Sequence, residues 1–330
     1  MTHTSSTVQP YDNLTPDIIL DAIESIGFEV SGSLFPLNSY ENRVYQIGLN
    51  DESDLIAKFY RPHRWSDAMI LEEHAFSSEL AENDIPVIAP ININNKSLFI
   101  YQGYRFAIFP KRGGRSPELD NDEHLKWLGR FMGRIHAVGR TARFQHRPTL
   151  TVKRLGYDSY HFLTENNFIP DYLQHNYALV VEEILEKVSN RFEACLATNI
   201  RIHGDCHPGN ILWTPDGPHF VDLDDTMMGP AIQDLWMLLS GDQGQMEKQF
   251  KVIMEGYSMF SNFDLAELSL IEPLRALRQL HYSAWLARRW DDPAFPLHFP
   301  WFNTPRYWED HLNDLRQQNM LLDEDIIEYC

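Results

Sequence analysis

Apolar residues recur every three or four positions between Thr15 and Gly27, at Ile19, Ile23 and Ile26. That spacing places the three isoleucines on one face of a helix. A threonine followed by proline is typical of a helix start, and a glycine is typical of a helix end. The pattern therefore predicts one amphipathic helix near the amino end, which we expect to pack against the rest of the chain.

The pattern then changes to runs of β-forming residues. The runs ENRVYQIG and LIAKFY are separated by the polar stretch LNDESD, which predicts an antiparallel hairpin. ILEEHAFSSELAEN is typical of a helix, and SLFIYQGYRFAIFP predicts two further strands with a turn near Gln102 and Gly103. Several strands with one inserted helix predict a small β-rich lobe over residues 1–110.

Helical spacing dominates after residue 110. The segment Lys111-Arg112-Gly113-Gly114 is typical of a link between lobes. Beyond it, Leu125, Leu128, Met132 and Ile135 share one helix face, and LIEPLRALRQLHYSAWLARRW is also helical in pattern. Residues 111–330 therefore form a larger and mostly helical second lobe, interrupted near residues 200–225. The predicted fold class is α+β with two lobes.

The interruption carries the chemistry, in the run RIHGDCHPGNILWTPDGPHFVDLDD. If its Pro-Asp-Gly segment turns a hairpin centred on Asp216, symmetric pairing sets Asn210 opposite Asp222. Amide and carboxylate oxygens are the hard ligands that Mg²⁺ takes alongside water and substrate phosphates. Asp205 is then left to accept a hydroxyl proton in line with the γ-phosphate of ATP. The segment predicts a magnesium-dependent phosphotransferase with a protein-kinase-like fold.

Two other interpretations apply to the same segment. His203, Cys206 and His207 could hold zinc, but the Pro-Gly pair that follows them argues against a helix that would align the two histidines. Asp205 and Asn210 could instead only cap turns, which is common for such residues in loops. The joint pattern of His-Gly-Asp, an asparagine five residues later and an apolar strand that ends in aspartate favours the phosphotransferase.

Two neighbours of these residues leave alternatives open. Asp224 shares a strand face with Asp222 and could replace it as a metal ligand. Cys206 stands next to the candidate catalytic aspartate and could serve as a redox switch, but a buried structural thiol is the better interpretation.

The first lobe should supply a lysine for the phosphates. In LIAKFY, alternation places Lys58 on the face opposite Leu55, Ala57 and Phe59. A single lysine amid apolar residues could be a solvated edge-strand residue, or it could pair with a helix carboxylate and bind the α- and β-phosphates. Glu73 and Glu72 are the candidates for that carboxylate, and we prefer Glu73.

The chain contains neither GxGxxG nor GxxxxGK, so a glycine-rich phosphate loop is absent from the sequence. The turn Leu37-Asn38-Ser39-Tyr40-Glu41-Asn42 precedes the first strand of the hairpin. Its serine and asparagine side chains and its backbone N–H groups could contact phosphate, although an ordinary polar turn would have the same composition.

Composition limits the other possibilities. The 330 residues are 43% hydrophobic, enough for two lobes with their own cores, and the net charge is −19. That charge repels nucleic acid and anionic membrane, and would attract a cationic acceptor. Three unevenly spaced cysteines, Cys195, Cys206 and Cys330, form no disulfide framework and indicate a reducing compartment. Neither a signal peptide nor a membrane-spanning run is apparent, so we expect a cytoplasmic protein.

The residues also resemble the aminoglycoside phosphotransferase and choline kinase superfamily, and within it bacterial serine/threonine protein kinases of the stress response. HGDxxxxN marks only the superfamily. The segments that narrow the resemblance cover nearly the whole chain: PLNSYENRVYQ, AKFYRP, ILEEH, HGDCHPGNILW, FVDLDD, GPAIQDLWMLL, LIEPLRALR and WLARRWDDPAFP.

The resemblance implies a role for each matching residue. Asp234 would anchor the catalytic loop from a helix start, although a helix N-cap would use the same residue. Gly204 stands where conventional protein kinases have arginine, so control through a phosphorylated activation loop is not expected. The implied site is Asp205 as proton acceptor, Asn210 and Asp222 as Mg²⁺ ligands, Ser39 as an ATP contact, Lys58 and Glu73 as an ion pair, and Phe109 to Lys111 as the hinge beside adenine.

The same resemblance implies a monomer that phosphorylates serine or threonine of proteins, with autophosphorylation included. A small-molecule kinase for an aminoglycoside, choline, homoserine or sugar hydroxyl would use the same residues. A non-catalytic ATP-binding scaffold is the third function, and the presence of Asp205, Asn210, Asp222 and Lys58 together argues against it.

Overall fold

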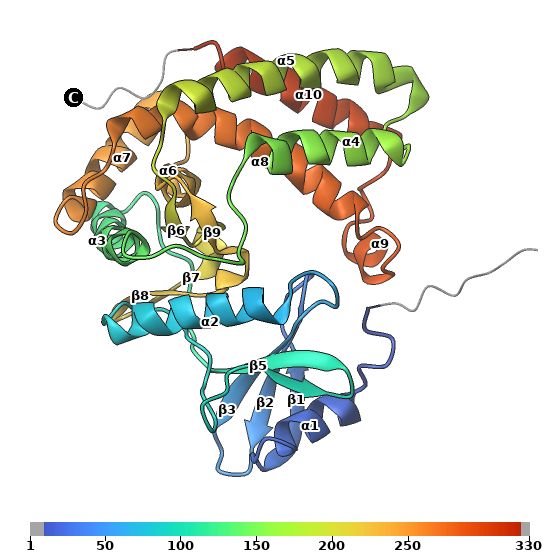
Figure 1. The fold of residues 1–330 in the computed structure, drawn as a ribbon, viewed down its shortest axis with the longest axis vertical. Helices are drawn as coiled ribbons and strands as arrows, with labels where there is room; N and C mark the ends of the chain where they lie inside the picture. The colour runs from blue at the N-terminus through green and yellow to red at the C-terminus, as the bar shows by residue number, and fades with distance from the viewer. Residues whose placement is uncertain (1–9, 325–330) are drawn as a thin grey trace, which may run out of the picture. The chain divides into compact units, whose positions relative to one another are not determined.

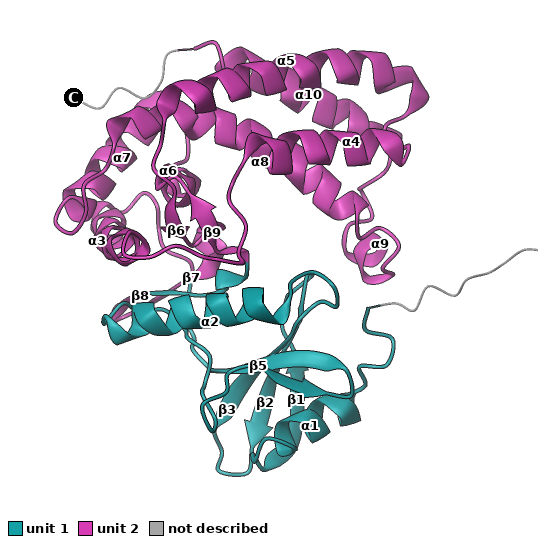
Figure 2. Ribbon diagram, viewed as in Figure 1, with its two compact units in different colours: residues 1–115, 219–224 teal, residues 116–218, 225–330 magenta. Residues whose placement is uncertain are grey.

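The computed structural model describes residues 10–324, so Cys330 and the first nine residues lie outside the described part. The chain divides into two compact units (Figure 2). Unit 1 consists of residues 1–115 together with 219–224, and unit 2 of residues 116–218 together with 225–330. The first lobe predicted from the sequence, residues 1–110, does not include residues 219–224, which group with unit 1.

Unit 1 is built on a five-stranded antiparallel sheet with strand order β1-β2-β3-β5-β4 (Figure 1). The predicted hairpin is confirmed, with Val44 of β2 opposite Lys58 of β3. The second predicted pair, β4 and β5, turns at Gln102 and Gly103, both with positive φ. The edge strand β1 was not predicted. The strands are β1 Val30–Pro36, β2 Arg43–Leu49, β3 Asp54–Phe59, β4 Phe99–Tyr101 and β5 Tyr104–Pro110.

The helix α1, Pro16–Glu24, confirms the first predicted helix. The Thr15 side chain caps it by accepting a hydrogen bond from the backbone N–H of Ile18. Ile19 and Ile23 are fully buried in one cluster with Ala57 and Phe59 of β3. Alternation along β3 therefore sends these two strand residues toward α1, and Lys58 to the opposite face.

The opposite face of the sheet packs against α2, Asp67–Glu82, which contains the helix predicted from ILEEHAFSSELAEN. Ile70 of α2 shares a buried cluster with Tyr60 and Ala107. Glu73 and His74 of α2 are also buried. The face of β3 that carries Lys58 therefore meets a helix that brings a buried carboxylate.

Unit 2 is mostly helical, as predicted, and its largest described core joins α5, α8 and α10 (Figure 1). The carboxy-terminal aromatic residues belong mainly to this core, with Phe295, Phe302 and Trp308 fully buried. The helices and turns are α3 Asp122–Gly139, η1 Lys153–Tyr157, α4 Asp158–Glu165, α5 Asp171–Cys195, η2 Pro208–Asn210, η3 Leu223–Asp225, α6 Ile232–Leu235, η4 Trp236–Leu238, α7 Gln243–Tyr257, η5 Leu265–Leu270, α8 Ile271–Ala287, α9 Ala294–His298 and α10 Pro305–Leu321.

Two small sheets interrupt the helices. Strand β6, Ile200–Ile202, pairs antiparallel with β9, Met227–Gly229, and β7, Ile211–Thr214, pairs with β8, Gly217–Phe220. The unit boundary falls within β8, after Pro218.

The hairpin between β7 and β8 corrects one prediction. Its turn consists of Pro215 and Asp216 alone, because Gly217 already belongs to β8. The predicted pairing of Asn210 with Asp222 required a three-residue turn centred on Asp216. The two-residue turn shifts the register by one residue, so it does not set these two residues opposite each other. Every helix within residues 10–324 is either too short or too polar to span a lipid bilayer.

Candidate active site

Strand β6 leads directly into the loop that carries Asp205. The carboxylate of Asp234, at the start of α6, accepts hydrogen bonds from the backbone N–H of His203 at 2.7 Å and of Gly204 at 2.8 Å. Asp234 is fully buried, and its carboxylate also lies 3.2 Å from Nε2 of His136. A buried carboxylate that accepts two backbone donors fixes the start of the loop, as the sequence resemblance implied.

Gly204 allows the loop to turn at this point. Its φ is +87°, and a Cβ placed on it would lie 2.2 Å from the carbonyl oxygen of Asp225. The side-chain amide of Gln233 donates to the Gly204 carbonyl at 2.9 Å. Any larger residue would clash with backbone, so the loop that presents Asp205 depends on a glycine here.

Asp205 follows with a partly exposed side chain. Its Oδ1 accepts a hydrogen bond from Nη1 of Arg278, on α8, at 2.8 Å. Its Oδ2 lies 3.6 Å from Nε2 of His207, beyond hydrogen-bond distance. The side-chain nitrogen of Asn210 donates to the Asp205 backbone carbonyl at 3.0 Å. The loop therefore folds back on Asp205 and holds one carboxylate oxygen by a hydrogen bond, while the other oxygen has the more distant imidazole of His207 nearby.

The same geometry weighs against a zinc site. Cys206 is fully buried with its Sγ 3.7 Å from Sδ of Met132, and burial raises the pKa of its thiol well above the ordinary value. Nδ1 of His203 and of His207 each accept a backbone N–H of their own loop. Within residues 10–324, no group of three or more His, Cys, Asp and Glu side chains is arranged to hold a metal ion. Cys206 is a buried structural thiol.

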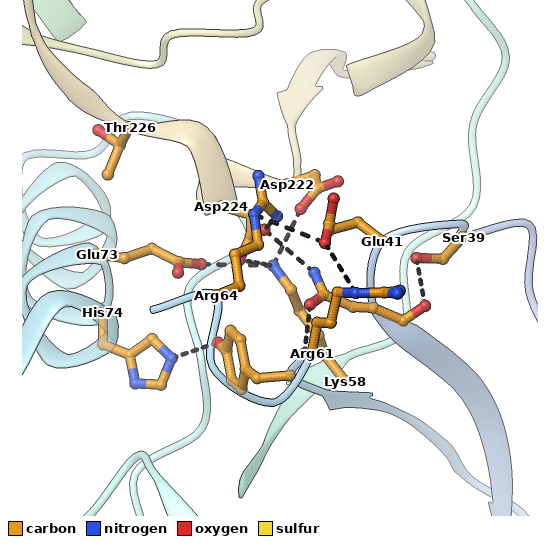
Figure 3. Close-up of polar contacts among 12 residues, drawn as sticks. Ser39, Glu41, Lys58, Arg61, Arg64, Glu73, His74, Asp222, Asp224 and Thr226 are labelled. Atoms are coloured by element: carbon orange, nitrogen blue, oxygen red, sulfur yellow. Dashed lines mark hydrogen bonds and ion pairs between the residues drawn. The ribbon is translucent and has the colours of Figure 1, made fainter. Parts of the chain in front are cut away.

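Unit 1 contains the predicted lysine in an acidic cluster (Figure 3). Nζ of Lys58 lies 3.0 Å from Asp222, 3.2 Å from Asp224 and 3.6 Å from Glu73. Burial by itself would lower the pKa of Lys58. The three carboxylates outweigh burial and hold that pKa well above its ordinary value, so the lysine stays protonated. Between the two candidate glutamates, it is Glu73 that makes the contact.

The two aspartates of this cluster differ in their surroundings. Asp224 is buried, and its carboxylate contacts Arg64 and accepts a hydrogen bond from Nδ2 of Asn42 at 3.2 Å (Figure 3). The side chain of Asp222 is 53% exposed while its Oδ1 contacts Lys58. Asp222 also has a φ of +58°, a conformation that aspartate tolerates better than most residues. Asp224 is thus enclosed by protein groups, whereas Asp222 presents a carboxylate to solvent.

The remaining predicted residues also lie in unit 1. The hydroxyl of Ser39 donates to the carbonyl of Asn42 at 3.1 Å and closes the turn before β2. Phe109 pairs with Ile56 across the sheet, and Nζ of Lys111 lies 2.7 Å from Asp54. These contacts place Phe109 and Lys111 at the end of β5, immediately before the link that leaves the unit.

Comparison with known proteins shows which family and which proteins the chain is similar to. The model of the phosphotransferase enzyme family matches residues 34–271. The chain belongs to the phosphotransferase enzyme family. It is 45% identical to stress response kinase A of Escherichia coli strain K12, over 95% of both chains. It is also 45% identical, again over 95% of both chains, to a protein of Salmonella typhimurium named serine/threonine protein kinase RdoA.

Solved structures show the same protein-kinase-like fold. Amicoumacin kinase, in complex with AMP-PNP, Ca²⁺ and Ami, matches with a TM-score of 0.72 at 17% identity, over 95% of this chain and 93% of that one. The choline kinase LicA from Streptococcus pneumoniae matches with a TM-score of 0.61 at 13% identity, over 92% and 98%. The phosphotransferase fold, a five-stranded antiparallel sheet followed by a mostly helical part, is therefore shared despite low identity.

Several groups of this candidate site are not evident from the sequence. Arg278 is separated from Asp205 by 73 positions, and no local pattern links the two. Arg64 and Asn42 come from the turns on either side of the first hairpin, and both contact the carboxylate of Asp224. They lie 160 and 182 positions from Asp224 in the sequence, so no local pattern indicates these contacts.

Proposed function

We propose that the protein is an ATP- and Mg²⁺-dependent serine/threonine protein kinase. The observation that carries this proposal is the buried Lys58, whose Nζ lies within 3.6 Å of three carboxylates. A buried charge cluster is a weak source of stability, so its presence favours a role in binding the phosphates of ATP. The relatives named as kinases, at 45% identity over nearly the whole chain, favour a protein as acceptor.

In this proposal Asp205 is the proton acceptor. Arg278 occupies Oδ1, and no described residue donates a hydrogen bond to Oδ2. Oδ2 takes the proton of the serine or threonine hydroxyl as its oxygen bonds to the γ-phosphorus. The bond between that phosphorus and the β–γ bridging oxygen breaks, and ADP leaves with the electron pair.

Asn210 and Asp222 are the proposed Mg²⁺ ligands. The Asn210 amide nitrogen is engaged within its own loop, and its oxygen accepts no hydrogen bond from the described residues. The half-exposed carboxylate of Asp222 supplies the second hard oxygen. Bound there, Mg²⁺ would neutralise charge on the phosphate oxygens. Asp224 instead positions Lys58, because protein groups surround its carboxylate.

The other ATP contacts extend from unit 1. Lys58, kept in place by Glu73, binds the α- and β-phosphates, and Ser39 contacts ATP from the turn before β2. Phe109 to Lys111 border adenine at the end of β5. A monomeric state, a cytoplasmic location, autophosphorylation and a role in stress survival stay predictions from the sequence.

Transfer of label from γ-labelled ATP tests the proposal. The purified protein is incubated with Mg²⁺ and a set of generic protein acceptors, beside an Asp205→Ala variant. We expect label on protein serine or threonine, at least a hundredfold less with the variant. Asp205-dependent ATP turnover that only a small hydroxyl compound stimulates would replace the protein kinase by a small-molecule kinase.

A further inference from the structure

Helix α8 places a cation beside the candidate catalytic residue. Arg278 donates to Oδ1 of Asp205 through Nη1, and its side chain is 44% exposed. A guanidinium group carries five N–H donors in a planar fork. Arg278 can therefore hold Asp205 and bind a second anion at the same time, which places an anion-binding group next to the acceptor hydroxyl.

Three further residues continue from Arg278 along the same face of α8. Tyr282, Trp285 and Arg289 follow it at helical spacing, Arg289 in the turn after the helix. The rings of Tyr282 and Trp285 stack with centroids 5.8 Å apart and planes 16° apart. The guanidinium of Arg289 lies 5.1 Å from the centroid of the Trp285 ring. We call these four residues the α8 stripe: two arginines with an aromatic surface between them.

The surroundings of the α8 stripe are also basic. Burial lowers the pKa of the neighbouring His281 to about 4, and the charges of Arg288, Arg154 and Arg289 act in the same direction while Asp225 opposes them. Four cations, counting Arg278, thus gather along this part of unit 2.

The nearby carboxylate of Asp158 does not cancel this charge. Its Oδ1 lies 2.6 Å from Nζ of Lys153, and its backbone carbonyl accepts a hydrogen bond from Arg288. With Lys153, five cations in this part of unit 2 accompany the three carboxylates of Asp158, Asp205 and Asp225, so the local charge has the opposite sign to the net charge of −19 of the whole chain.

We propose that the acceptor is an acidic polypeptide segment that binds along the α8 stripe, a proposal that rests on the protein-kinase function above. The net charge predicted a cationic acceptor, but a local basic surface decides what approaches Asp205. Arg278 binds a carboxylate adjacent to the accepting serine or threonine. Tyr282 and Trp285 contact an apolar or aromatic residue, and Arg289 binds a second carboxylate.

Helix geometry sets the spacing of these acceptor residues. Arg278 and Arg289 are separated by about 16 Å along the helix axis at 1.5 Å per residue. An extended peptide covers that distance in about five residues at 3.3 Å each. The preferred acceptor therefore has one acidic residue next to the hydroxyl residue, a second about five positions away and an apolar residue between them.

A set of matched peptides tests this with the full-length protein, ATP and Mg²⁺. Each peptide carries one serine, with Glu, Gln or Lys at the adjacent position and at the position five residues beyond that one, on either side of the serine. We expect kcat/KM for the Glu peptide to exceed that for the Lys peptide roughly tenfold or more, the ratio that two exposed ion pairs produce. The difference should lie mainly in KM for the peptide.

Charge reversal on the stripe gives the second readout. Arg289→Glu should abolish or invert the preference at the second of these positions, and Arg288→Glu, at a more exposed site, should weaken it. Arg306→Glu is the matched control, because Arg306 lies on α10 with a side chain 90% exposed and should leave the preference unchanged. Circular dichroism of each variant confirms folding.

The outcomes separate the two proposals. A wild-type protein that labels neutral or basic peptides better than acidic ones, with labelling abolished by Asp205→Ala, overturns the acidic acceptor and leaves the kinase function in place. Equal effects of Arg289→Glu and Arg306→Glu also overturn it. If no peptide or protein receives Asp205-dependent label, the protein-kinase assignment fails and the acceptor proposal fails with it.

Discussion

Replacement of Lys58 by alanine should destabilise unit 1 strongly, because it removes the shared counter-charge of three carboxylates. Glu73 and Asp224 have side chains only 3% exposed, so they cannot recover hydration in place of the lost contact. Removal of one partner from a buried ion pair costs roughly 3–5 kcal/mol. Arg64 still contacts Asp224 in the variant, so we expect a loss near the lower end, about 3 kcal/mol.

Calorimetric unfolding of Lys58→Ala measures this loss. For a unit of this size, about 3 kcal/mol corresponds to a fall in Tm of roughly 10 °C. Lys111→Ala is the matched control in the same sheet, since its pair with Asp54 is exposed and should contribute less than about 1 kcal/mol. Adding Glu73→Gln to Lys58→Ala should recover part of the stability by removing one unpaired charge. A Tm for Lys58→Ala within 2 °C of the wild type would show that Lys58 is not needed to stabilise the three carboxylates.

Three further predictions concern unit 2. Gly204→Ala should lower the free energy of unfolding by about 1–3 kcal/mol from its backbone conformation alone, as measured by urea denaturation. It should also lower kcat in a kinase assay, because the new Cβ would meet the Asp225 carbonyl and displace the loop that carries Asp205. An unchanged kcat would contradict this prediction. Asp234→Asn should lower the free energy of unfolding by about 1–3 kcal/mol, because the NH₂ group of the new asparagine would face a backbone N–H of the loop. An unchanged free energy of unfolding would mean that the loop does not depend on the Asp234 carboxylate. Burial raises the pKa of Glu267 from 4.5 to about 7, so its folded state binds the proton more tightly and its contribution to stability falls as pH rises through that interval. Glu267→Gln should remove a decline on the order of 3 kcal/mol between pH 4.5 and 8, and an identical decline in both proteins would rule out Glu267 as its source.

The sequence predicted those parts of the fold whose signal is local. Alternation in LIAKFY placed Lys58 opposite the α1-facing core residues Ala57 and Phe59, and the structure has this arrangement. The start of α1 followed from Thr15, which caps it. Edge strand β1 was not predicted. Its residues are mostly exposed, so its sequence lacks the alternation of apolar and polar residues that marks a half-buried strand.

The contacts within the candidate site depended on tertiary structure. The sequence could not choose between Glu72 and Glu73 until the rotation of α2 was known, because adjacent helix residues point about 100° apart. The link between Arg278 and Asp205 joins a helix to a loop 73 positions earlier, so no local pattern carries it. The predicted turn at residues 215–217 was one residue too long, and a shift of one residue changes every cross-strand partner.

Single-turnover transfer by Asp205→Ala, with ATP affinity measured in parallel, tests the central claim most directly. Asp205 lies in unit 2, whereas the proposed phosphate-binding residues Lys58 and Glu73 lie in unit 1. We expect Asp205→Ala to bind Mg²⁺-ATP within about twofold of the wild type but to transfer the γ-phosphoryl group at least a hundredfold more slowly. Transfer at the wild-type rate by Asp205→Ala would exclude Asp205 as the proton acceptor.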